Sequence, residues 1–437
     1  MQDIFHKHIK AEFPELLETP FLIAISGGVD SVVLAHLCNY LKLDFALAHC
    51  NFHLRAEESD HDALFVEKLA KQLNCKFFKK SFDTKEESRV SKASIQITAR
   101  HLRYQWFEQL IESTSYKLLL TAHHLDDSLE TFIINLSRST GIKGLTGIPG
   151  QNDYIRRPLL SFSKKEIKDY AIDHNLEWRE DQSNTSTKYL RNQIRHKIVP
   201  ELKQINPNFL SNFGSSLQKI KDAESLLEDY THLLFKALIK EKDDHYEIDI
   251  VKLKQYPNQK AILYQLLEGF GFKEWNDVYD LMEAQTGKYI ESPTHALYKN
   301  RDKLVLSTNS TQQFQSIDID ENQSEIQLNG YRLKLSIVDK LGDLDSNLAY
   351  FDYAKLKFPL SLRSVNKGDF FYPFGMKGKK KLSDFLKDEK ISPHKKSNQS
   401  VLCNGNDDII WVLSLRTDNR YRVDQATDKI LKIEYLK

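Results

Sequence analysis

Short apolar runs alternate with longer stretches of helical periodicity in the first half of the chain. Four of the apolar runs predict strands: 21–25, 45–50, 76–82 and 117–123. Three of these four runs are apolar enough to be buried on both faces of a sheet. The stretches between them place apolar residues three and four positions apart, as core-facing helices do: 31–41, 61–73 and 97–111. This alternation predicts an α/β domain with a doubly wound parallel sheet. Such a sheet binds ligands at the carboxyl ends of its strands.

The pattern changes after about residue 210. Residues 209–239 form a long amphipathic helical pattern, which predicts a helical domain that extends to about residue 310. Residues 307–325 are polar and indicate a linker with edge strands. Short alternating runs such as 331–338 and 409–415 then predict a small mixed α+β domain. We therefore expect three domains, over residues 1–210, 211–310 and 325–437.

Composition and charge narrow the class of protein. Of the 437 residues, 41% are hydrophobic and 28% charged, as in an ordinary globular protein, and the net charge of +1 means that any nucleic-acid-binding surface must be local. The four cysteines form no CxxC pair, which argues against a zinc ribbon and fits a reducing cytoplasm: Cys38, Cys50, Cys75 and Cys403. No signal-peptide core and no run of about 18 apolar residues occurs, so we expect a cytoplasmic protein without a membrane span.

The strongest local motif is SGGVDS, which lies directly after the first predicted strand and before the first predicted helix. Its two glycines allow the backbone to turn tightly and to approach a ligand closely. The hydroxyls of Ser26 and Ser31, together with the amides at the helix N-terminus, can donate to phosphate. The motif lacks the GK[ST] ending of a Walker loop and the GxGxxG spacing of a dinucleotide site. A plain strand-to-helix turn with an N-terminal cap is the alternative.

This phosphate loop resembles the pyrophosphatase loop of the N-type ATP pyrophosphatase superfamily, whose members split ATP between its α and β phosphates to adenylate a substrate. The resemblance implies that the loop binds ATP by holding its pyrophosphate, and the residues concerned are Ser26, Gly27, Gly28, Val29, Asp30 and Ser31. It also implies that Asp30 helps to bind Mg2+.

A carboxylate-rich helix is predicted to begin after the fourth strand, in the segment 121–131. Asp126 and Asp127 lie four and three positions before Glu130, so all three carboxylates are close together at the same edge of the sheet as the phosphate loop. Carboxylates at a helix N-terminus can also serve only to stabilise the helix dipole. The preceding His123 and His124 either cap the strand or bind metal, and no second cluster supports a dedicated metal site.

A basic segment follows at residues 180–202. Asp181 and Asn184 are predicted to lie in a turn, and Arg191 and Arg195 are four positions apart on one face of a helix. Two such arginines can bind phosphate or form ion pairs with carboxylates. A solvated basic helix face is the alternative.

The order of these motifs resembles that of the bacterial tRNA(Ile)-lysidine synthetases. The segments 49–55 and 97–104 are also similar to this family, and the C-terminal segments 374–393 and 407–423 match it more weakly. The chain departs from the family at Ser414, where a glycine is usual.

The resemblance implies a ligase that adenylates the carbon-2 carbonyl oxygen of the wobble cytidine in the CAU anticodon of tRNA(Ile) and then joins the ε-amine of free L-lysine to that carbon. Pyrophosphate and AMP leave, and the codon read changes from AUG to AUA. Loop donors and Mg2+ would then act on the phosphates, while Asp126, Asp127 and Glu130 would hold the lysine ammonium and take its proton. Arg191 and Arg195 would contact tRNA phosphate or hold the carboxylates.

A second basic cluster lies in the C-terminal region. Between Arg363 and Lys396, ten basic and four acidic residues give a local charge of +6. We predict that Lys379, Lys380 and Lys381 bind tRNA here, whereas a solvated charged loop is the alternative.

Two other functions stay open from the sequence. A tRNA thiolase could use the same ATP loop, although enzymes of that kind generally work with catalytic or cluster-binding cysteines, and the cysteines here lie unpaired in core-like runs. A non-catalytic RNA-binding protein on an ATPase scaffold is disfavoured by the intact loop and carboxylates.

Overall fold

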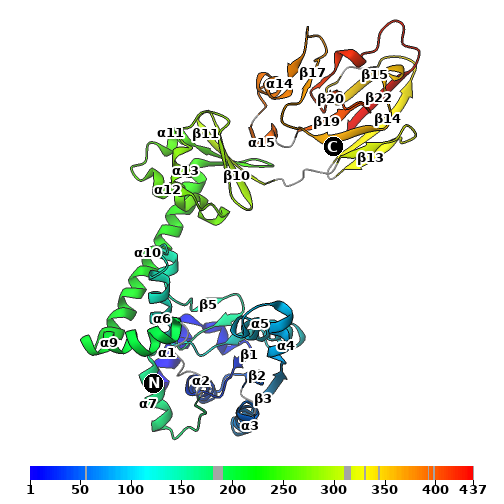
Figure 1. Ribbon diagram of the computed structural model, residues 1–437. Coiled ribbons are helices and arrows are strands. Elements are labelled where there is room, and N and C mark those ends of the chain that lie inside the picture. The colour runs from blue at the N-terminus through cyan, green and yellow to red at the C-terminus, as the bar shows by residue number, and fades with distance from the viewer. Residues whose placement is uncertain are drawn as a thin grey trace. The chain divides into compact units, whose positions relative to one another are not determined.

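The computed structural model describes residues 1–54, 57–180, 190–309, 316–328, 331–342, 345–391, 393–396 and 399–436. The chain forms two compact units, Met1–Glu228 and Asp229–Lys437. Figure 1 shows the elements of both units in chain order. Among the described residues, no helix is long and apolar enough to cross a membrane.

A six-stranded sheet forms the centre of the first unit. Its order is β3-β2-β1-β4-β6-β5, with β1 to β4 and β6 parallel and β5 antiparallel at the edge. The strands are β1 (Phe21–Ala24), β2 (Phe45–Asn51), β3 (Lys76–Ser81), β4 (Leu118–Leu120), β5 (Gln151–Asn152) and β6 (Ile155–Arg156). The four predicted strands are therefore present, and the predicted parallel α/β fold is confirmed.

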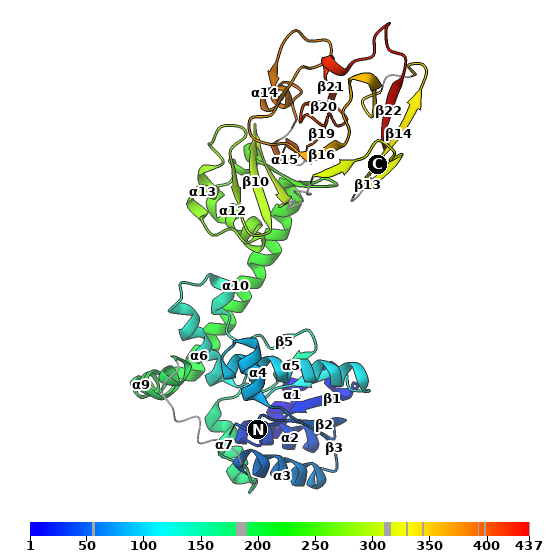
Figure 2. The same cartoon turned by 45° about the vertical axis from the view of Figure 1, so that its right-hand side comes forward.

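Helices cover both faces of this sheet (Figure 2). Phe21 and Ile23 of β1 pack into one core with α1 (Gln2–Glu12), α2 (Val29–Tyr40), α3 (Glu57–Gln72) and α7 (Lys164–Asp173). Leu22, between them, points to the other core, where it packs with Trp106 and Phe107 of α5 (Ile95–Ser113), which follows α4 (Thr84–Ser91). Because consecutive residues of β1 are buried on opposite faces, the strand reads as a continuous apolar run.

The rest of the first unit is helical. The carboxylate-rich helix is α6 (Leu125–Leu136), and the basic segment forms α8 (Leu190–Gln193), a π-helical turn at Ile194–Ile198 and α9 (Val199–Ile205). The predicted long amphipathic helix is α10 (Phe209–Leu238), which begins in the first unit and ends in the second.

The second unit begins with a five-stranded antiparallel sheet of order β7-β8-β11-β10-β9. Its strands are β7 (Ile239–Glu241), β8 (Tyr246–Asp249), β9 (Tyr289–Glu291), β10 (His295–Asn300) and β11 (Lys303–Thr308), with helices α11 (Ile250–Leu253), α12 (Gln259–Leu267) and α13 (Trp275–Asp280). The expectation of a helical region over 211–310 did not include these strands. In β10, Leu297 packs into one core while Ala296 and Tyr298 pack into another. Because both faces of this strand are buried, its sequence lacks the alternation of apolar and polar residues that predicts a strand.

Two further sheets complete the second unit, with orders β12-β16-β19-β20-β21 and β13-β14-β22-β15. They enclose a core that contains Phe351, Trp411 and Ile433. The strands are β12 (Ile317–Ile319), β13 (Glu325–Leu328), β14 (Tyr331–Val338), β15 (Leu348–Asp352), β16 (Leu360–Ser364), β19 (Ser400–Cys403), β20 (Ile409–Val412), β21 (Arg416–Thr417) and β22 (Ile430–Leu436), beside a short pair, β17 (Phe370–Phe371) and β18 (Lys380–Lys381), and helices α14 (Leu382–Asp388) and α15 (Pro393–Lys396). The predicted mixed α+β C-terminal part is confirmed.

Candidate active site

The strand order brings the two sequence motifs of the first unit to one place. From β1 the chain continues to β2 and β3 on one side, and then returns to β4 on the other side of β1. At this reversal of strand order, the connections that leave the carboxyl ends of β1 and β4 diverge and open a crevice. The phosphate loop follows β1 and α6 follows β4, so both border this crevice.

The phosphate loop is held in a tight conformation by its own hydroxyl groups. Gly27 has a φ of +90°, a left-handed conformation that favours glycine. The Gly28 amide donates to Ser26 Oγ at 3.2 Å, and Ser31 Oγ donates to the Gly28 carbonyl at 2.9 Å. Gly28 is the N-cap of α2 and supplies no side-chain acceptor, so the first amides of the helix keep their capacity to donate to an anion.

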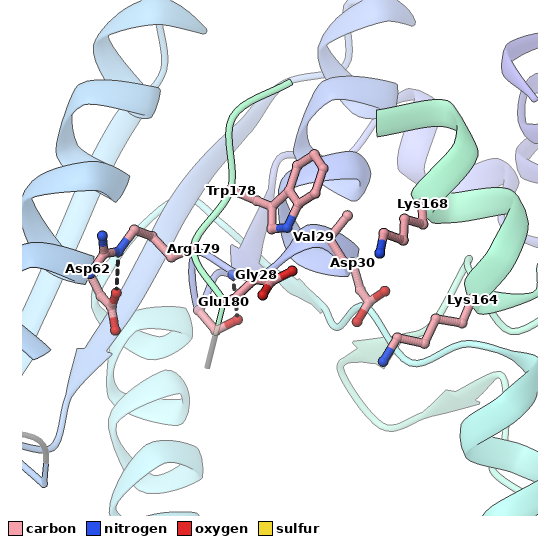
Figure 3. A pocket seen from close by; sticks show the side chains of 10 residues that line it. Gly28, Val29, Asp30, Asp62, Lys164, Lys168, Trp178, Arg179 and Glu180 are labelled. Atoms are coloured by element: carbon pink, nitrogen blue, oxygen red, sulfur yellow. Dashed lines mark hydrogen bonds and ion pairs between the residues drawn. The ribbon is translucent and has the colours of Figure 1, made fainter. Parts of the chain in front are cut away.

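A cavity of about 340 Å³ lies beside the loop (Figure 3). Lys164 and Lys168 reach from α7 toward Asp30, and Trp178 forms another wall. Arg179 donates instead to Asp62 at 3.0 Å. The cavity thus combines backbone donors, two ammonium groups and an aromatic face, which suits a phosphorylated ligand.

Asp30 has the environment of a cation ligand. Its Oδ1 atom is enclosed by protein and has no hydrogen-bond partner among the described residues, while Oδ2 lies 3.8 Å from His124 Nε2. Burial raises the pKa of Asp30, although the charges of His124 and Lys164 oppose this shift. Mg2+ is commonly held by one or two carboxylates together with substrate phosphates, so an unpartnered carboxylate oxygen beside a phosphate loop fits it. The described residues contain no cluster of three or more acidic, His or Cys side chains that could hold a metal by themselves.

The two histidines before α6 have structural partners. His124 is the N-cap of α6: its Nδ1 accepts the Asp127 amide at 3.4 Å, and its own amide donates to Asp127 Oδ2 at 3.1 Å. This reciprocal pair is a capping box, which satisfies two amides at the helix start. His123 Nδ1 lies 2.9 Å from Thr121 Oγ1, and burial lowers the pKa of His123 to about 4.

Glu130 and Asp127 form a network with the two predicted arginines. Glu130 is only 2% exposed, and Arg195 donates to both of its oxygens, from Nε at 2.6 Å and from Nη2 at 3.0 Å. Arg191 Nε donates to Glu130 at 2.8 Å, and both arginines donate to Asp127 Oδ1, at 3.2 and 3.0 Å. Burial favours the neutral form of Asp127, yet the surrounding charges and hydrogen bonds hold its pKa below the usual value.

These ion pairs agree with one of the alternatives left open by the sequence. Arg191 and Arg195 hold the carboxylates in this structure, and their binding to RNA stays a prediction. The predicted turn with Asp181 and Asn184 lies outside the described residues.

Asp126 faces a different group of side chains. Lys203 Nζ, from α9, donates to its Oδ1, and the Lys164 amide donates to its Oδ2 at 2.8 Å. Burial raises the pKa of Asp126, but these two hydrogen bonds and the Lys203 charge bring it below the usual value. Sequence reasoning missed Lys203, which has no local motif, and missed Lys164 and Lys168, whose spacing of four after a capping serine was a usable signal.

A second cavity of about 720 Å³ lies between the start of α6, the segment 160–166 and the helices α9 and α10. Leu125 and Leu217 provide apolar walls, and Lys203 and Lys221 provide ammonium groups. Burial lowers the pKa of Lys221. Ser163 and Lys165 line this cavity while Lys164 lines the first, so both cavities border the start of α7.

The cysteines do not have the character of thiolate catalysts. Cys38 is fully buried. Burial raises the pKa of Cys75 to about 11, and that of Cys50 and Cys403 to about 12. Because the thiolate is the reactive form, these environments disfavour the thiolase alternative.

The three predicted lysines of the second unit have different surroundings. Lys380 pairs with Asp388 at 2.6 Å and is 23% exposed, whereas the Lys379 ammonium lies 3.3 Å from the ring centre of Phe370 and Lys381 is exposed. Ser414 has a φ of +58°, a left-handed backbone conformation that glycine adopts more readily than serine.

Family models match three parts of the chain: a PP-loop domain at residues 1–202, a TilS substrate binding domain at 241–309 and a TilS substrate C-terminal domain at 360–435. The chain is 37% identical to a tRNA(Ile)-lysidine synthase of Parabacteroides distasonis, over 96% of both chains. It is 33% identical to the protein of the same name from Bacteroides thetaiotaomicron, over 97% of both chains.

Proposed function

Because the chain belongs to the tRNA(Ile)-lysidine synthase family, we propose that it joins free L-lysine to carbon 2 of the wobble cytidine in the CAU anticodon of tRNA(Ile). One observation carries this proposal: the phosphate loop and the carboxylates of α6 border the same crevice of a PP-loop domain. The chain is thus a ligase that forms a carbon–nitrogen bond and uses ATP.

In the first step, the carbon-2 carbonyl oxygen of the cytidine bonds to the α-phosphorus of ATP, and pyrophosphate leaves. Ser26 and Ser31, with the first amides of α2, hold the departing phosphates. Asp30, whose Oδ1 atom has no hydrogen-bond partner among the described residues, would hold Mg2+, which would supply positive charge at the phosphates. Lys164 and Lys168 add positive charge to the same cavity.

In the second step, the ε-amine of lysine bonds to carbon 2, loses a proton and expels AMP. We assign the binding of the lysine ammonium to Asp126, which already binds an ammonium group, that of Lys203. The second cavity suits the rest of the amino acid, because its apolar walls match the aliphatic stem and Lys221 can pair with the carboxylate.

Asp127 and Glu130 act mainly through the arginines. With both oxygens of Glu130 bonded, this residue fixes Arg195, whose charge acts on Asp30 and therefore on the phosphate site. Arg191 and Arg195 then contact phosphate groups of ATP or of tRNA from a fixed position. Asp127 is the candidate to take the proton of the attacking amine, because it lies next to Asp126 in the first turn of α6.

We divide the remaining work among three parts of the chain, as the sequence predicts: catalysis in residues 1–210, and tRNA binding in 211–310 and 325–437. Within the last part, Lys379 and Lys381 are the exposed candidates to contact phosphate, whereas Lys380 is tied to Asp388. The proposed substrates ATP, lysine and tRNA support a cytoplasmic location for the reaction.

The test incubates the protein with ATP, radiolabelled lysine and tRNA(Ile) transcripts that carry either a CAU or a GAU anticodon. Label bound only to the CAU transcript, at the wobble nucleoside, is the expected result. Exchange of pyrophosphate into ATP in the presence of tRNA checks adenylation separately. Binding of tRNA without exchange would favour the non-catalytic alternative, and exchange without lysine transfer would contradict the assigned product.

A further inference from the structure

Two buried side-chain polar atoms of the described residues have no hydrogen-bond partner: Asp30 Oδ1 and Arg157 Nε. The first fits a cation, as argued above, and the second is a donor that a ligand oxygen can satisfy. The Arg157 side chain is 7% exposed, and its Nη1 atom donates to the Pro149 carbonyl at 2.8 Å. This bond leaves the edge formed by Nε and Nη2, with which a guanidinium can bind two oxygens of one anion.

No carboxylate pairs with Arg157 among the described residues, although other arginines of the first unit have one. Arg156, Arg179 and Arg195 pair with Glu15, Asp62 and Glu130. Burial lowers the pKa of Arg157, a shift that Tyr104 opposes and the charge of Arg100 reinforces. Because a buried cation is normally paired, the missing partner points to an anionic ligand.

Arg157 lies at the carboxyl edge of the sheet, directly after β6. The Thr121 amide, which follows β4, donates to the Arg156 carbonyl at 3.0 Å, so Arg157 is beside the segment that leads into α6. In the strand order, β4 separates β6 from β1 and its phosphate loop. Arg157 does not line the cavity beside that loop. It therefore borders the crevice on the side away from the proposed ATP phosphates.

Positive charge continues from Arg157 along α5. Arg100 and Arg103 are exposed, and the Arg100 guanidinium lies 5.0 Å from the ring centre of Tyr104. The three residues lie three and four positions apart, on one face of the helix. Residues 95–107 of α5 contain no acidic side chain. Arginines that lead from a buried donor to solvent suit a polyanion, because successive phosphates of a nucleic acid can follow them.

We propose that Arg157 binds a phosphodiester of the tRNA that adjoins the wobble cytidine. The proposal rests on the proposed function, which brings this nucleotide to the crevice. The phosphates of ATP are the other source of the same chemistry, but the loop, Lys164 and Lys168 surround them in a cavity that Arg157 does not line. A phosphate held at Arg157 fixes the RNA backbone, so that the cytidine base is positioned toward the phosphate loop.

The first experiment changes only the RNA. The dissociation constant of the unchanged protein is measured for tRNA(Ile) with one uncharged methylphosphonate linkage, placed directly before or directly after the wobble cytidine. The nucleotide preceding the linkage carries a 2′-O-methyl group in the modified and the reference RNA alike, because its free hydroxyl would cleave the linkage. One of the two substitutions should weaken binding roughly 10- to 150-fold, the range for loss of hydrogen bonds to a charged group.

Arg157→Gln tests the partner in the protein. It should weaken binding of the unmodified tRNA by a similar factor and reduce the salt dependence by roughly 1 unit of slope. In this variant the sensitive methylphosphonate should cause no further loss. Arg157→Lys keeps the charge without the planar fork, so it should keep the salt slope and recover only part of the affinity. Lys117→Gln, which removes an exposed charge beside the opposite end of β4, should bind like the unchanged protein.

The affinity for ATP alone should not change in Arg157→Gln, which also shows that the first unit is folded. If this variant binds neither ligand, Arg157→Lys with the same RNAs decides. A loss confined to ATP would assign Arg157 to the ATP phosphates, and a higher KM confined to lysine would assign it to the lysine carboxylate. Either result would overturn the proposal, as would unchanged binding of both methylphosphonate RNAs.

Lysine transfer by the unchanged protein is measured in parallel. Its absence counts against the proposed function. Normal transfer, without coupling between Arg157 and either linkage, counts against the phosphate site alone.

Discussion

Replacing Asp30 by alanine should make the first unit more stable in the absence of ligands. The enclosed Oδ1 atom has lost its hydrogen bonds to water and has gained none from the protein, which costs about 1–3 kcal/mol. Against this, Asp30 lies in the first turn of α2, where a carboxylate stabilises the helix by about 0.3–1 kcal/mol. We expect a net gain of about 1 kcal/mol, or about 2–4 °C in the Tm of a unit of this size.

The same substitution should remove the stabilisation by Mg2+ and ATP. A ligand at one hundred times its dissociation constant stabilises the protein by about 2.7 kcal/mol. In the unchanged protein, the increase in the free energy of unfolding caused by ATP should depend on Mg2+. In Asp30→Ala, the Mg2+-dependent part of this increase should disappear. An ion-binding carboxylate is expected to lower the stability of the free protein and to raise the stability of its complex with the ligand.

The measurement must report on the first unit alone, because the chain has two units and a single unfolding transition is not assured. Amide hydrogen exchange of peptides from β1 and α2, followed during denaturation, meets this need. Asp3→Ala is the matched control, because Asp3 also lies in a first helical turn and its loss should be slightly destabilising. A lower stability of Asp30→Ala without ligand, or an intact Mg2+-dependent increment, would refute the assignment of Asp30.

Three further predictions concern the other charged groups. Asp126→Asn should raise the KM for lysine with little effect on the KM for ATP. Lys203→Met should lower the KM for lysine, because it frees Asp126 from its partner. A rise in the KM for lysine in both variants would show that Lys203 itself binds lysine. Replacing Lys379 and Lys381 by alanine should reduce the salt dependence of tRNA binding by roughly 1–2 units of slope, and an unchanged slope would place the phosphate contacts elsewhere. Arg195→Met should destabilise the first unit by about 2–3 kcal/mol at pH 7, because Glu130 keeps only Arg191. Since the folded-state pKa of Asp127 is lowered, the stability from this network is full above the usual Asp pKa of about 4 and is lost as the pH falls, so the Arg195→Met effect on urea unfolding should shrink toward pH 3.

The phosphate loop and α6 were predictable because their signals are local. A buried strand, two glycines and a helix start fall within a dozen residues, and their order places the loop at the carboxyl end of β1. The parallel sheet then follows from the alternation of strands and helices. Only the strand order was needed to bring α6 beside the loop, and a crevice at that point is a general property of such sheets.

The partners of the carboxylates were not predictable in the same way. Lys203 lies 77 positions after Asp126, on a short helix whose sequence carries no motif. The two arginines were found by their spacing, but that spacing fits a solvated face, a phosphate site or a carboxylate pair equally well. Only the packing of α8 and the π-helical turn against α6 shows that the arginines pair with the carboxylates.

The charges of the site restrict how lysine can enter it. Asp126, Asp127 and Glu130 are matched by Lys203, Arg191 and Arg195, so the described carboxylates of α6 are already neutralised before any substrate binds. An arginine pair bound at two points to a buried carboxylate is costly to displace, whereas Lys203 holds Asp126 through one ammonium group and is 37% exposed. The lysine ammonium can therefore replace that of Lys203 one for one, without a change in net charge. This makes Asp126, and not the more deeply buried Glu130, the carboxylate of α6 best able to bind the incoming lysine.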